Sequence, residues 1–475
     1  MRCIPGRAIL LAMALVMMCG CHAKKAAWTE STSAGYWKET SCSMHAGSDT
    51  TADIRVLLQE KQQVVDGFGA CFNELGWDAL RTLTKAKREE VLRNLWEPLS
   101  GLNLRICRMP IGANDYARSW YSLDDSAGDF ALKYFSLERD RQTLIPYIKA
   151  AMRYNPDLQV WGSPWCPPAW MKTNGHYACR PDTVNDLDSA GAGMENKTGF
   201  RMQQKYLETY AAYFVKYIKA YRNEGINLFA VHVQNEPNSC QNFPSCIWTA
   251  QDMNTFIGKF LGPAVQSVRP AVQLWYGTIE RASVEKVDTV LQDPLSSKYV
   301  SGVAFQWAGK FAIPAVHAHY PEMKLMQSET ECGDGSNDWN AAVYTFGLMK
   351  HYFDNGVSIY SFWNPVLDET GKSKWGWKQN SLVTVDTKRQ AIVYNPEYYL
   401  LKHFSHYIKP GARKLALAGK AEHCLAFLNP GNQLVLIIYN EKPGRAITKI
   451  SFGNQFIDPD LAPGSLNTFV IPLTE

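Results

Sequence analysis

Eight short apolar, β-branched segments alternate along the chain with longer stretches in which apolar residues recur every three to four positions. The short segments predict strands, and the longer stretches predict amphipathic helices with one charged face. Eight strands, each followed by a helical stretch, are typical of a (β/α)₈ or TIM barrel, an α/β fold. The predicted strands span 64–72, 102–111, 158–166, 226–235, 272–279, 301–308, 324–330 and 357–364, and the clearest helices span 85–96, 141–155 and 203–225.

The alternation of strands and helices stops near residue 408. Residues 409–475 contain short apolar runs separated by turns rich in Gly, Pro and Asn, without a helical pattern. That pattern predicts a β-sandwich side domain built mainly from the C-terminus. We expect 51–63 to add one strand to it, which leaves 64–408 as the catalytic barrel.

The N-terminus has the pattern of an export signal. Two arginines lie within the first seven residues, an apolar run follows at 8–18, and Cys21 comes directly after a glycine. The run is too short for a stable membrane span, and the cysteine resembles a bacterial lipobox. We therefore predict a signal peptide at 1–21, lipidation of Cys21 and a flexible tether at 22–50. The expected location is the outer membrane or cell surface through the lipid anchor, or otherwise the periplasm or medium.

Composition and charge narrow the possible partners. The 475 residues are 46% apolar and 20% charged with a net charge of +4, and they contain no dense basic block, so nucleic acid is not an expected partner. Of 12 cysteines, nine follow the predicted signal peptide; none forms a CxxC pair, and no histidine cluster accompanies them. We expect no metal site and no cofactor. Cys240 and Cys246 flank a proline-containing loop and could pair.

Functional side chains of a TIM barrel lie at the carboxyl ends of its strands. Polar and aromatic residues stand at several of these ends, and two carboxylates among them would face one pocket. In chain order the residues are Arg108 and then Asp115, Trp165, Asn235 with Glu236, Gln306 with Trp307, Glu329 with Glu331, and Trp363.

Two facing carboxylates are what glycoside hydrolysis requires, because one protonates the leaving oxygen and the other attacks the sugar or activates water. Glu236 and Glu329 follow the fourth and seventh strands, which could hold them about 5–5.5 Å apart, the retaining geometry. Pro237 ends the strand and fixes the turn that aims Glu236. Two other classes remain open: a glycan-binding lipoprotein without turnover, and a metal-dependent barrel hydrolase, which would need the missing histidine cluster.

The chain resembles glycoside hydrolase family 30, the family of glucosylceramidases and endo-β-1,6-glucanases. The resemblance covers about residues 50–475, and its most specific motif is "GSPWCPPAWMKTNG" at 162–175. The other matching motifs are "DGFGACFNELGW" (66–77), "RMPIGANDYA" (108–117), "VQNEPNS" (233–239), "MQSETECG" (326–333) and "SFWNPVLD" (361–368).

The resemblance implies a retaining double displacement with Glu236 as general acid/base and Glu329 as nucleophile. Glu331 is the rival nucleophile, since it lies two positions further along the same strand and faces the same side. Glu74 is interpreted as structural. The implied substrate-binding residues are Arg108, Asp115, Trp165, Asn235, Trp307 and Trp363.

Two departures bear on the substrate. Gln306 stands where glucosylceramidases carry histidine, and the loop 368–380 is rich in Lys and Trp. "CFNELGW" is more similar to the bacterial β-1,6-glucanase branch. We therefore expect endo action on β-1,6-glucan, with glucosylceramide as the alternative and other β-glycosides, including xylosides and fucosides, after it. The sequence makes no prediction of oligomeric state.

Overall fold

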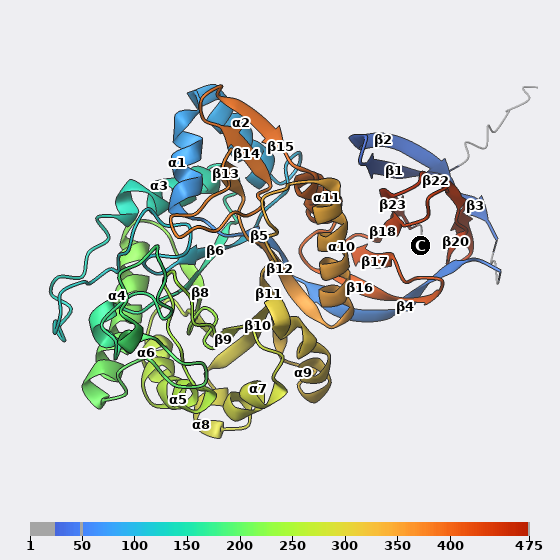
Figure 1. Cartoon of the computed structure of the whole chain (residues 1–475). Coiled ribbons are helices and arrows are strands. Elements are labelled where there is room, and N and C mark those ends of the chain that lie inside the picture. Colours follow the sequence, from blue (N-terminus) through green and yellow to red (C-terminus); the bar gives the residue numbers. More distant parts are fainter. Residues whose placement is uncertain (1–23, 48–50, 474–475) are drawn as a thin grey trace, which may run out of the picture.

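The computed structural model describes residues 24–47 and 51–473, which form a barrel with a strand-rich domain at its side (Figure 1). Eight parallel strands make the barrel in the order β5-β12-β11-β10-β9-β8-β7-β6. The ring closes between β5 and β6, where Phe72 N donates to Arg108 O at 2.9 Å. The predicted TIM barrel is therefore confirmed. Its strands are β5 (Gly67–Ala70), β6 (Ile106–Pro110), β7 (Gln159–Ser163), β8 (Leu228–His232), β9 (Gln273–Ile279), β10 (Val300–Gln306), β11 (Lys324–Glu329) and β12 (Val357–Phe362).

Helices surround the barrel, and several of them begin at capping side chains. Thr84 accepts a hydrogen bond from Lys87 N before α2, and Asp338 accepts one from Ala341 N before α10. No helix in the described residues is long and apolar enough to cross a membrane. The helices are α1 (Glu74–Thr82), α2 (Lys85–Trp96), α3 (Leu144–Met152), α4 (Gln204–Asn223), α5 (Ala250–Phe256), α6 (Gly262–Gln266), α7 (Val284–Leu291), α8 (Pro294–Ser297), α9 (Ile313–His319), α10 (Trp339–Asp354) and α11 (Pro396–Ser405).

The lower interior of the barrel is filled by large rings. Trp161, His232 and Trp275 come from three adjacent strands and stack with centroid separations of 4.0 and 5.7 Å. Burial lowers the pKa of His232 well below its usual range, so this ring is neutral. The rings close the barrel beneath Arg108, whose guanidinium lies 5.1 Å from the Trp161 ring. Chemistry is thereby confined to the carboxyl ends of the strands.

The side domain is a ten-stranded sheet in the order β2-β1-β23-β18-β17-β16-β4-β20-β21-β3. β4 lies where we predicted a strand before the barrel, and it pairs antiparallel with β16. Buried residues such as Leu415, Leu436 and Phe469 form the core of this domain. The strands are β1 (Lys25–Thr32), β2 (Gly35–Ser43), β3 (His45–Ala46), β4 (Ile54–Val65), β16 (Ala412–Gly419), β17 (Cys424–Asn429), β18 (Gln433–Asn440), β20 (Ile450–Phe452), β21 (Gln455–Ile457) and β23 (Ser465–Pro472), with β19 (Ala446–Ile447) and β22 (Asp460–Leu461) paired separately.

The prediction of a flexible tether at 22–50 is wrong for the part of this segment that the structure describes. β1 pairs antiparallel with both β2 and β23, so this segment belongs to the sheet. Ala26 is fully buried, and the Trp28 ring packs 5.3 Å from the Phe469 ring. The Ser- and Thr-rich composition indicated a linker, but Thr also suits strands, and a few buried apolar residues suffice to anchor a strand near the edge of a sheet. The predicted signal peptide and Cys21 lie outside the described residues.

A small three-stranded sheet follows the last barrel strand, β12, and was not predicted. β13 (Val366–Asp368) pairs with β14 (Val383–Asp386), which pairs with β15 (Ala391–Tyr394). The Lys- and Trp-rich loop 368–380 connects β13 to β14, so this sheet holds both ends of the loop.

Candidate active site

Arg108 is the centre of the hydrogen-bond network at the carboxyl ends of the strands. It lies two positions after Ile106 on β6, so both side chains point into the barrel. Its guanidinium is fully buried and donates to Glu329 Oε2 at 2.7 Å, to Asn235 Oδ1 at 2.6 Å and to Ser163 Oγ at 3.0 Å. One cation thereby fixes side chains from three other strand ends.

The amide of Gln306 connects the two candidate catalytic carboxylates. Its Nε2 donates to Glu236 Oε1 at 2.9 Å and lies 3.4 Å from Glu329 Oε2. The two carboxylate oxygens are therefore no farther apart than the sum of these distances. This limit applies to one pair of oxygens, and it is compatible with the about 5–5.5 Å between the carboxyl groups of retaining glycosidases.

Glu236 is aimed by a backbone conformation that side chains rarely adopt. Its φ is +45°, in the left-handed region, and Pro237 follows directly. Glu236 N donates to Thr278 O at 3.2 Å, and Thr278 Oγ1 donates to Asn235 Oδ1 at 3.0 Å. Such a conformation costs about 1–3 kcal/mol and persists only where surrounding contacts hold it. The end of β9 holds the Asn235–Glu236 turn in this way.

The charge balance of the pocket requires a bound proton. Burial raises the pKa of Glu236 above its usual value and that of Glu329 well above its usual range. It also raises the pKa of Asp115 to about 7. Three ionised carboxylates against Arg108 would leave excess buried charge. Glu329 accepts a charged hydrogen bond from Arg108, whereas Glu236 accepts from the neutral amide of Gln306. The Arg108 contact opposes the effect of burial at Glu329, so the arrangement that these contacts favour has the charge on Glu329 and the proton on Glu236.

Two buried aromatic rings and a carboxyl group lie beside the candidate catalytic carboxylates. The Trp165 ring lies 4.1 Å from the Arg108 guanidinium and 5.5 Å from the Trp363 ring. Trp363 Nε1 donates to Gln379 Oε1 at 2.8 Å. Asp115 is 5% exposed, and its Oδ1 is buried without a hydrogen-bond partner among the described residues. Rings that stack on C–H faces, beside an unpaired acceptor for hydroxyl groups, suit a pyranose.

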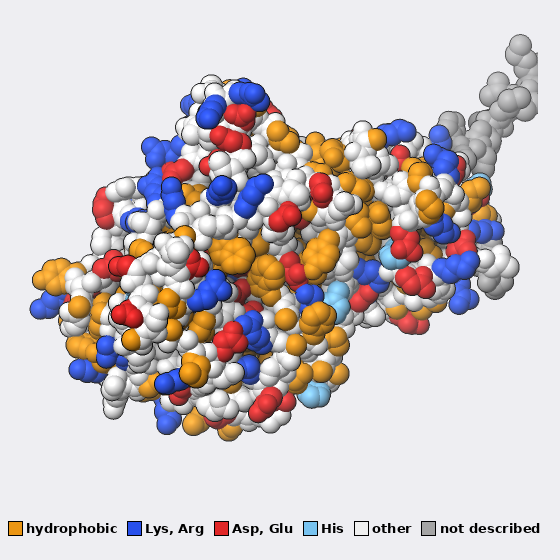
Figure 2. Space-filling view, in the orientation of Figure 1, with side chains coloured by type: hydrophobic (Ala, Val, Ile, Leu, Met, Phe, Trp, Pro, Cys, Tyr) orange, Lys and Arg blue, Asp and Glu red, His pale blue; other side chains and the backbone are white. Residues whose placement is uncertain are grey.

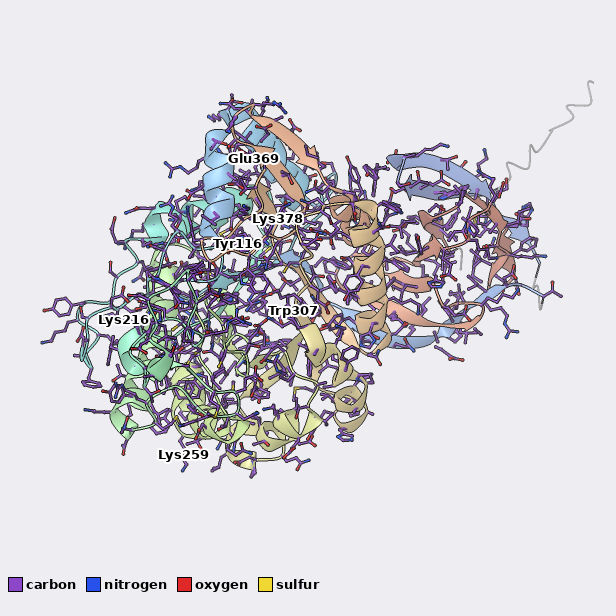
Figure 3. The ribbon with its side chains drawn as sticks, viewed as in Figure 1. Tyr116, Lys216, Lys259, Trp307, Glu369 and Lys378 are labelled. Atoms are coloured by element: carbon purple, nitrogen blue, oxygen red, sulfur yellow. The ribbon has the colours of Figure 1, made fainter. Side chains whose placement is uncertain are left out.

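The structure brings most of the predicted site residues together. Arg108, Asn235, Glu236 and Glu329 share one hydrogen-bond network, and Trp165 and Trp363 pack beside it. Trp307 begins a short 3₁₀ helix directly after Gln306, with a φ of +48°. In the view of Figure 3 it projects onto the central part of the barrel, as does Tyr116, whereas Lys216 and Lys259 lie towards the rim.

The two other carboxylates considered have partners elsewhere. Glu331 forms an ion pair with Lys310 and accepts a hydrogen bond from Tyr344 at 2.5 Å. Glu74 is buried at the start of α1 and pairs with Arg139 at 2.7 Å. These contacts fit a structural role for Glu74 and give Glu331 surroundings different from those of Glu329.

Sequence reasoning missed four residues that support the site. Glu280 follows β9 directly, accepts hydrogen bonds from Asn238 N at 2.8 Å and Ser239 Oγ at 3.1 Å, and is 1% exposed. Its position after the fifth strand was a signal that could have found it. Ser163 and Thr278 also lie at strand ends. Gln379 lies in a loop, where no periodic signal exists.

Comparisons with known proteins identify the family. The family model for the glycosyl hydrolase family 30 TIM-barrel domain matches residues 65–408. Lysosomal acid glucosylceramidase of Mus musculus is 28% identical over 93% of this chain and 88% of its own length. Endo-1,6-beta-D-glucanase neg1 of Aspergillus fumigatus is 29% identical over 86% of this chain and 87% of its own.

Solved structures show the same fold. SrfJ from Salmonella typhimurium superposes with a TM-score of 0.84 at 24% identity, covering 95% of this chain and 100% of that one. The endo-beta1,6-glucanase BT3312 superposes with a TM-score of 0.80 at 23% identity, covering 95% and 99%.

Proposed function

This chain belongs to glycosyl hydrolase family 30, and we propose that it hydrolyses internal bonds of β-1,6-glucan. It is a glycosidase of a family in which the retaining mechanism is general. Within that mechanism we assign Glu329 as nucleophile and Glu236 as acid/base. The observation that carries the assignment is the shared contact of both carboxylates with Gln306, together with the ion pair of Glu329 and Arg108.

The reaction has two displacement steps. In the first, the Glu329 carboxylate attacks the anomeric carbon, the carbon–oxygen bond breaks, and Glu236 passes its proton to the leaving oxygen. The ester on Glu329 carries no charge, so the pKa of Glu236 falls and its carboxylate can act as base. In the second step Glu236 takes a proton from water, the water oxygen attacks the same carbon, and Glu329 is released as a carboxylate.

The loop 368–380 supports a polar polymer as the substrate. Tyr116 OH donates a hydrogen bond to Gly371 O at 2.9 Å, and Gln379 Oε1 accepts one from Trp363 Nε1. The loop is therefore attached to the aromatic residues of the site. Trp377 is 39% exposed and packs 6.1 Å from Phe243, in the loop after Glu236. The three lysines of the loop 368–380 are exposed. Figure 2 shows hydrophobic side chains gathered near the centre of the barrel face with Lys and Arg above them.

Aromatic rings interspersed with charged side chains bind sugar faces and hydroxyl groups. A further ring set lies nearby, with Trp120 4.7 Å from Trp375 and 5.8 Å from Tyr177. Glucosylceramide would need a broad apolar surface for its alkyl chains, which the exposed lysines of the loop interrupt. It remains the second candidate because relatives of similar identity are named glucosylceramidases.

The test is product analysis with β-1,6-glucan and with glucosylceramide, using the wild-type protein and Glu329→Gln. Release of a series of short β-1,6-linked oligosaccharides by wild type alone supports the proposal. Glucose released one unit at a time would exclude endo action. Activity only on glucosylceramide would replace β-1,6-glucan with the second candidate.

We also propose that the protein is exported and held at the outer membrane or cell surface by a lipid on Cys21. The support is the N-terminal sequence pattern. Mass spectrometry of the mature N-terminal peptide tests it: a diacylated cysteine at position 21 is expected, and an unmodified N-terminus would contradict the anchor.

A further inference from the structure

Four cysteines and a buried lysine lie close together in the loops that follow β7 and β8. Lys172 is 1% exposed, and its ammonium donates to Tyr177 O at 3.0 Å, Ala178 O at 3.1 Å and Ser245 O at 2.7 Å. The same nitrogen lies 3.6 Å from Cys179 Sγ. The glycosidase mechanism uses none of these groups. The cysteines are Cys166, Cys179, Cys240 and Cys246.

Cys179 and Cys240 meet although they lie on different loops. Cys179 N donates to Gln241 O at 2.9 Å, which joins the two backbones beside the cysteines. Both side chains border the same glycine, Gly193. A Cβ added to Gly193 would lie 3.1 Å from Cys179 Cβ and 3.2 Å from Cys240 Sγ. The absence of a side chain at Gly193 leaves room for this pair.

The pair shares one proton. The hydrogen bond from Cys240 and the Lys172 ammonium hold the pKa of the Cys179 thiol well below its usual range. The same contact raises the pKa of Cys240. Cys179 is 2% exposed, whereas Cys240 is partly exposed. Cys179 is thus a buried thiol whose ionisation the neighbouring cation favours, and Cys240 is accessible to reagents from solvent.

We propose that Cys179 and Cys240 form a redox-active pair that closes to a disulfide when the protein meets a small-molecule disulfide. The Cys240 sulfur attacks one sulfur of the reagent, its proton passes to Cys179, and one thiolate of the reagent leaves. Cys179 then attacks Cys240 Sγ, the Cys179 proton passes to the departing sulfur, and the second half of the reagent leaves as a thiol. Two cysteines are oxidised and one small disulfide is reduced to two thiols.

The disulfide joins the β7–α4 loop to the β8–α5 loop. Glu236 lies four residues before Cys240, and Asn238 and Ser239 between them are held by Glu280. Oxidation therefore cross-links the segment that follows Glu236 to the neighbouring loop after β7. Because the closed chain loop is long, we expect the oxidised protein to melt several degrees higher.

The pairing differs from the one that sequence spacing suggested. Cys246 is fully buried, and its thiol contacts Ile247 O at 3.8 Å. Cys240 instead points to Cys179, 61 positions earlier in the chain but adjacent in space. All nine described cysteines are thiols in this structure, so the pair is in its reduced form.

The experiment treats the protein with oxidised glutathione, blocks residual thiols and maps the peptides by mass spectrometry. We expect a cross-linked peptide joining Cys179 to Cys240 that dithiothreitol removes. Cys179→Ser should stop at a glutathione adduct on Cys240, and Cys246→Ser, the matched control, should still form the cross-link. A Cys240–Cys246 cross-link, or free Cys179 and Cys240 in the folded wild type after oxidation, would overturn the proposal.

A melting curve of the oxidised and reduced forms is the second readout. The wild type and Cys246→Ser should both show the increase on oxidation, and Cys179→Ser should not. An increase that persists in Cys179→Ser would show that another thiol is responsible.

Discussion

Arg108 donates a hydrogen bond to Glu329 at 2.7 Å where the two side chains are 0% and 7% exposed. A buried ion pair of this kind is a weak source of stability, because both charges lose their hydration. Its chemical effect is larger, since it favours the ionised form of a carboxylate that burial alone would keep protonated. In the proposed mechanism this pair opposes the effect of burial and keeps Glu329 available as the nucleophile.

Replacing Arg108 should shift the pH dependence of the reaction. Arg108→Gln removes the charge that lowers the pKa of Glu329, so the acidic limb of the pH profile should move to higher pH. Below the new limb, kcat/KM should fall by about 10²-fold or more. Rates from pH 4 to 9 on an aryl glucoside measure this. An unshifted limb in a variant with a normal melting curve would contradict the role of Arg108.

Glu236→Gln should affect substrates according to their leaving group. An amide cannot donate the proton, so cleavage of an unactivated glucan should slow by about 10²–10⁴-fold. A dinitrophenyl glucoside, whose leaving group needs no proton, should react far less slowly in its first step. The basic limb of the profile should also disappear. Equal losses on both substrates would remove Glu236 as the acid.

Glu331 provides the matched control for Glu329. Its carboxylate pairs with Lys310 and Tyr344 and, within the described part of the chain, makes no hydrogen bond to Arg108 or Gln306. We expect Glu331→Gln to keep activity within a few-fold of wild type, with a modest loss of stability, whereas Glu329→Gln should lose turnover. Parallel kinetics on the two variants decide between them, and the reverse order would reassign the nucleophile.

Glu280 should make the protein less stable as pH rises. Burial and the nearby Glu236 charge raise its pKa in the folded state to about 8, against about 4.3 in the unfolded chain. Between these values the folded state holds a proton that the unfolded state has released, so the free energy of unfolding falls with increasing pH. Glu280→Gln can still accept the hydrogen bond from Asn238 N, but it has no carboxyl to titrate. From pH 5 to pH 8 the free energy of unfolding of wild type should therefore fall by about 2–4 kcal/mol more than that of the variant.

Chemical denaturation of wild type and Glu280→Gln at both pH values measures this difference. A difference between the two proteins that does not change with pH would show that the Glu280 carboxyl keeps an ordinary pKa when folded.

The sequence was sufficient for the barrel because strand periodicity depends on burial alone. Seven of the eight predicted strands contain the observed strand whole, and 301–308 misses only Val300 of β10. The residues at strand ends converged as parallel topology requires. The part of 22–50 in the sheet was misread because its few buried residues, such as Ala26, are scattered among polar ones. Gln379 reaches Trp363 from a loop, and Cys179 meets Cys240 across two loops. Such contacts depend on tertiary geometry, which no local pattern encodes.

The most direct measurement is to trap the glycosyl-enzyme with a 2-deoxy-2-fluoro-β-glucoside carrying an activated leaving group. The fluorine slows both steps, and the good leaving group lets the first proceed, so the ester accumulates. Fragmentation of the labelled peptide should place one sugar on Glu329 in wild type and in Glu331→Gln, and none should form in Glu329→Gln. A label on Glu331, or hydrolysis with inversion at the anomeric carbon and no trapped ester, would contradict the account.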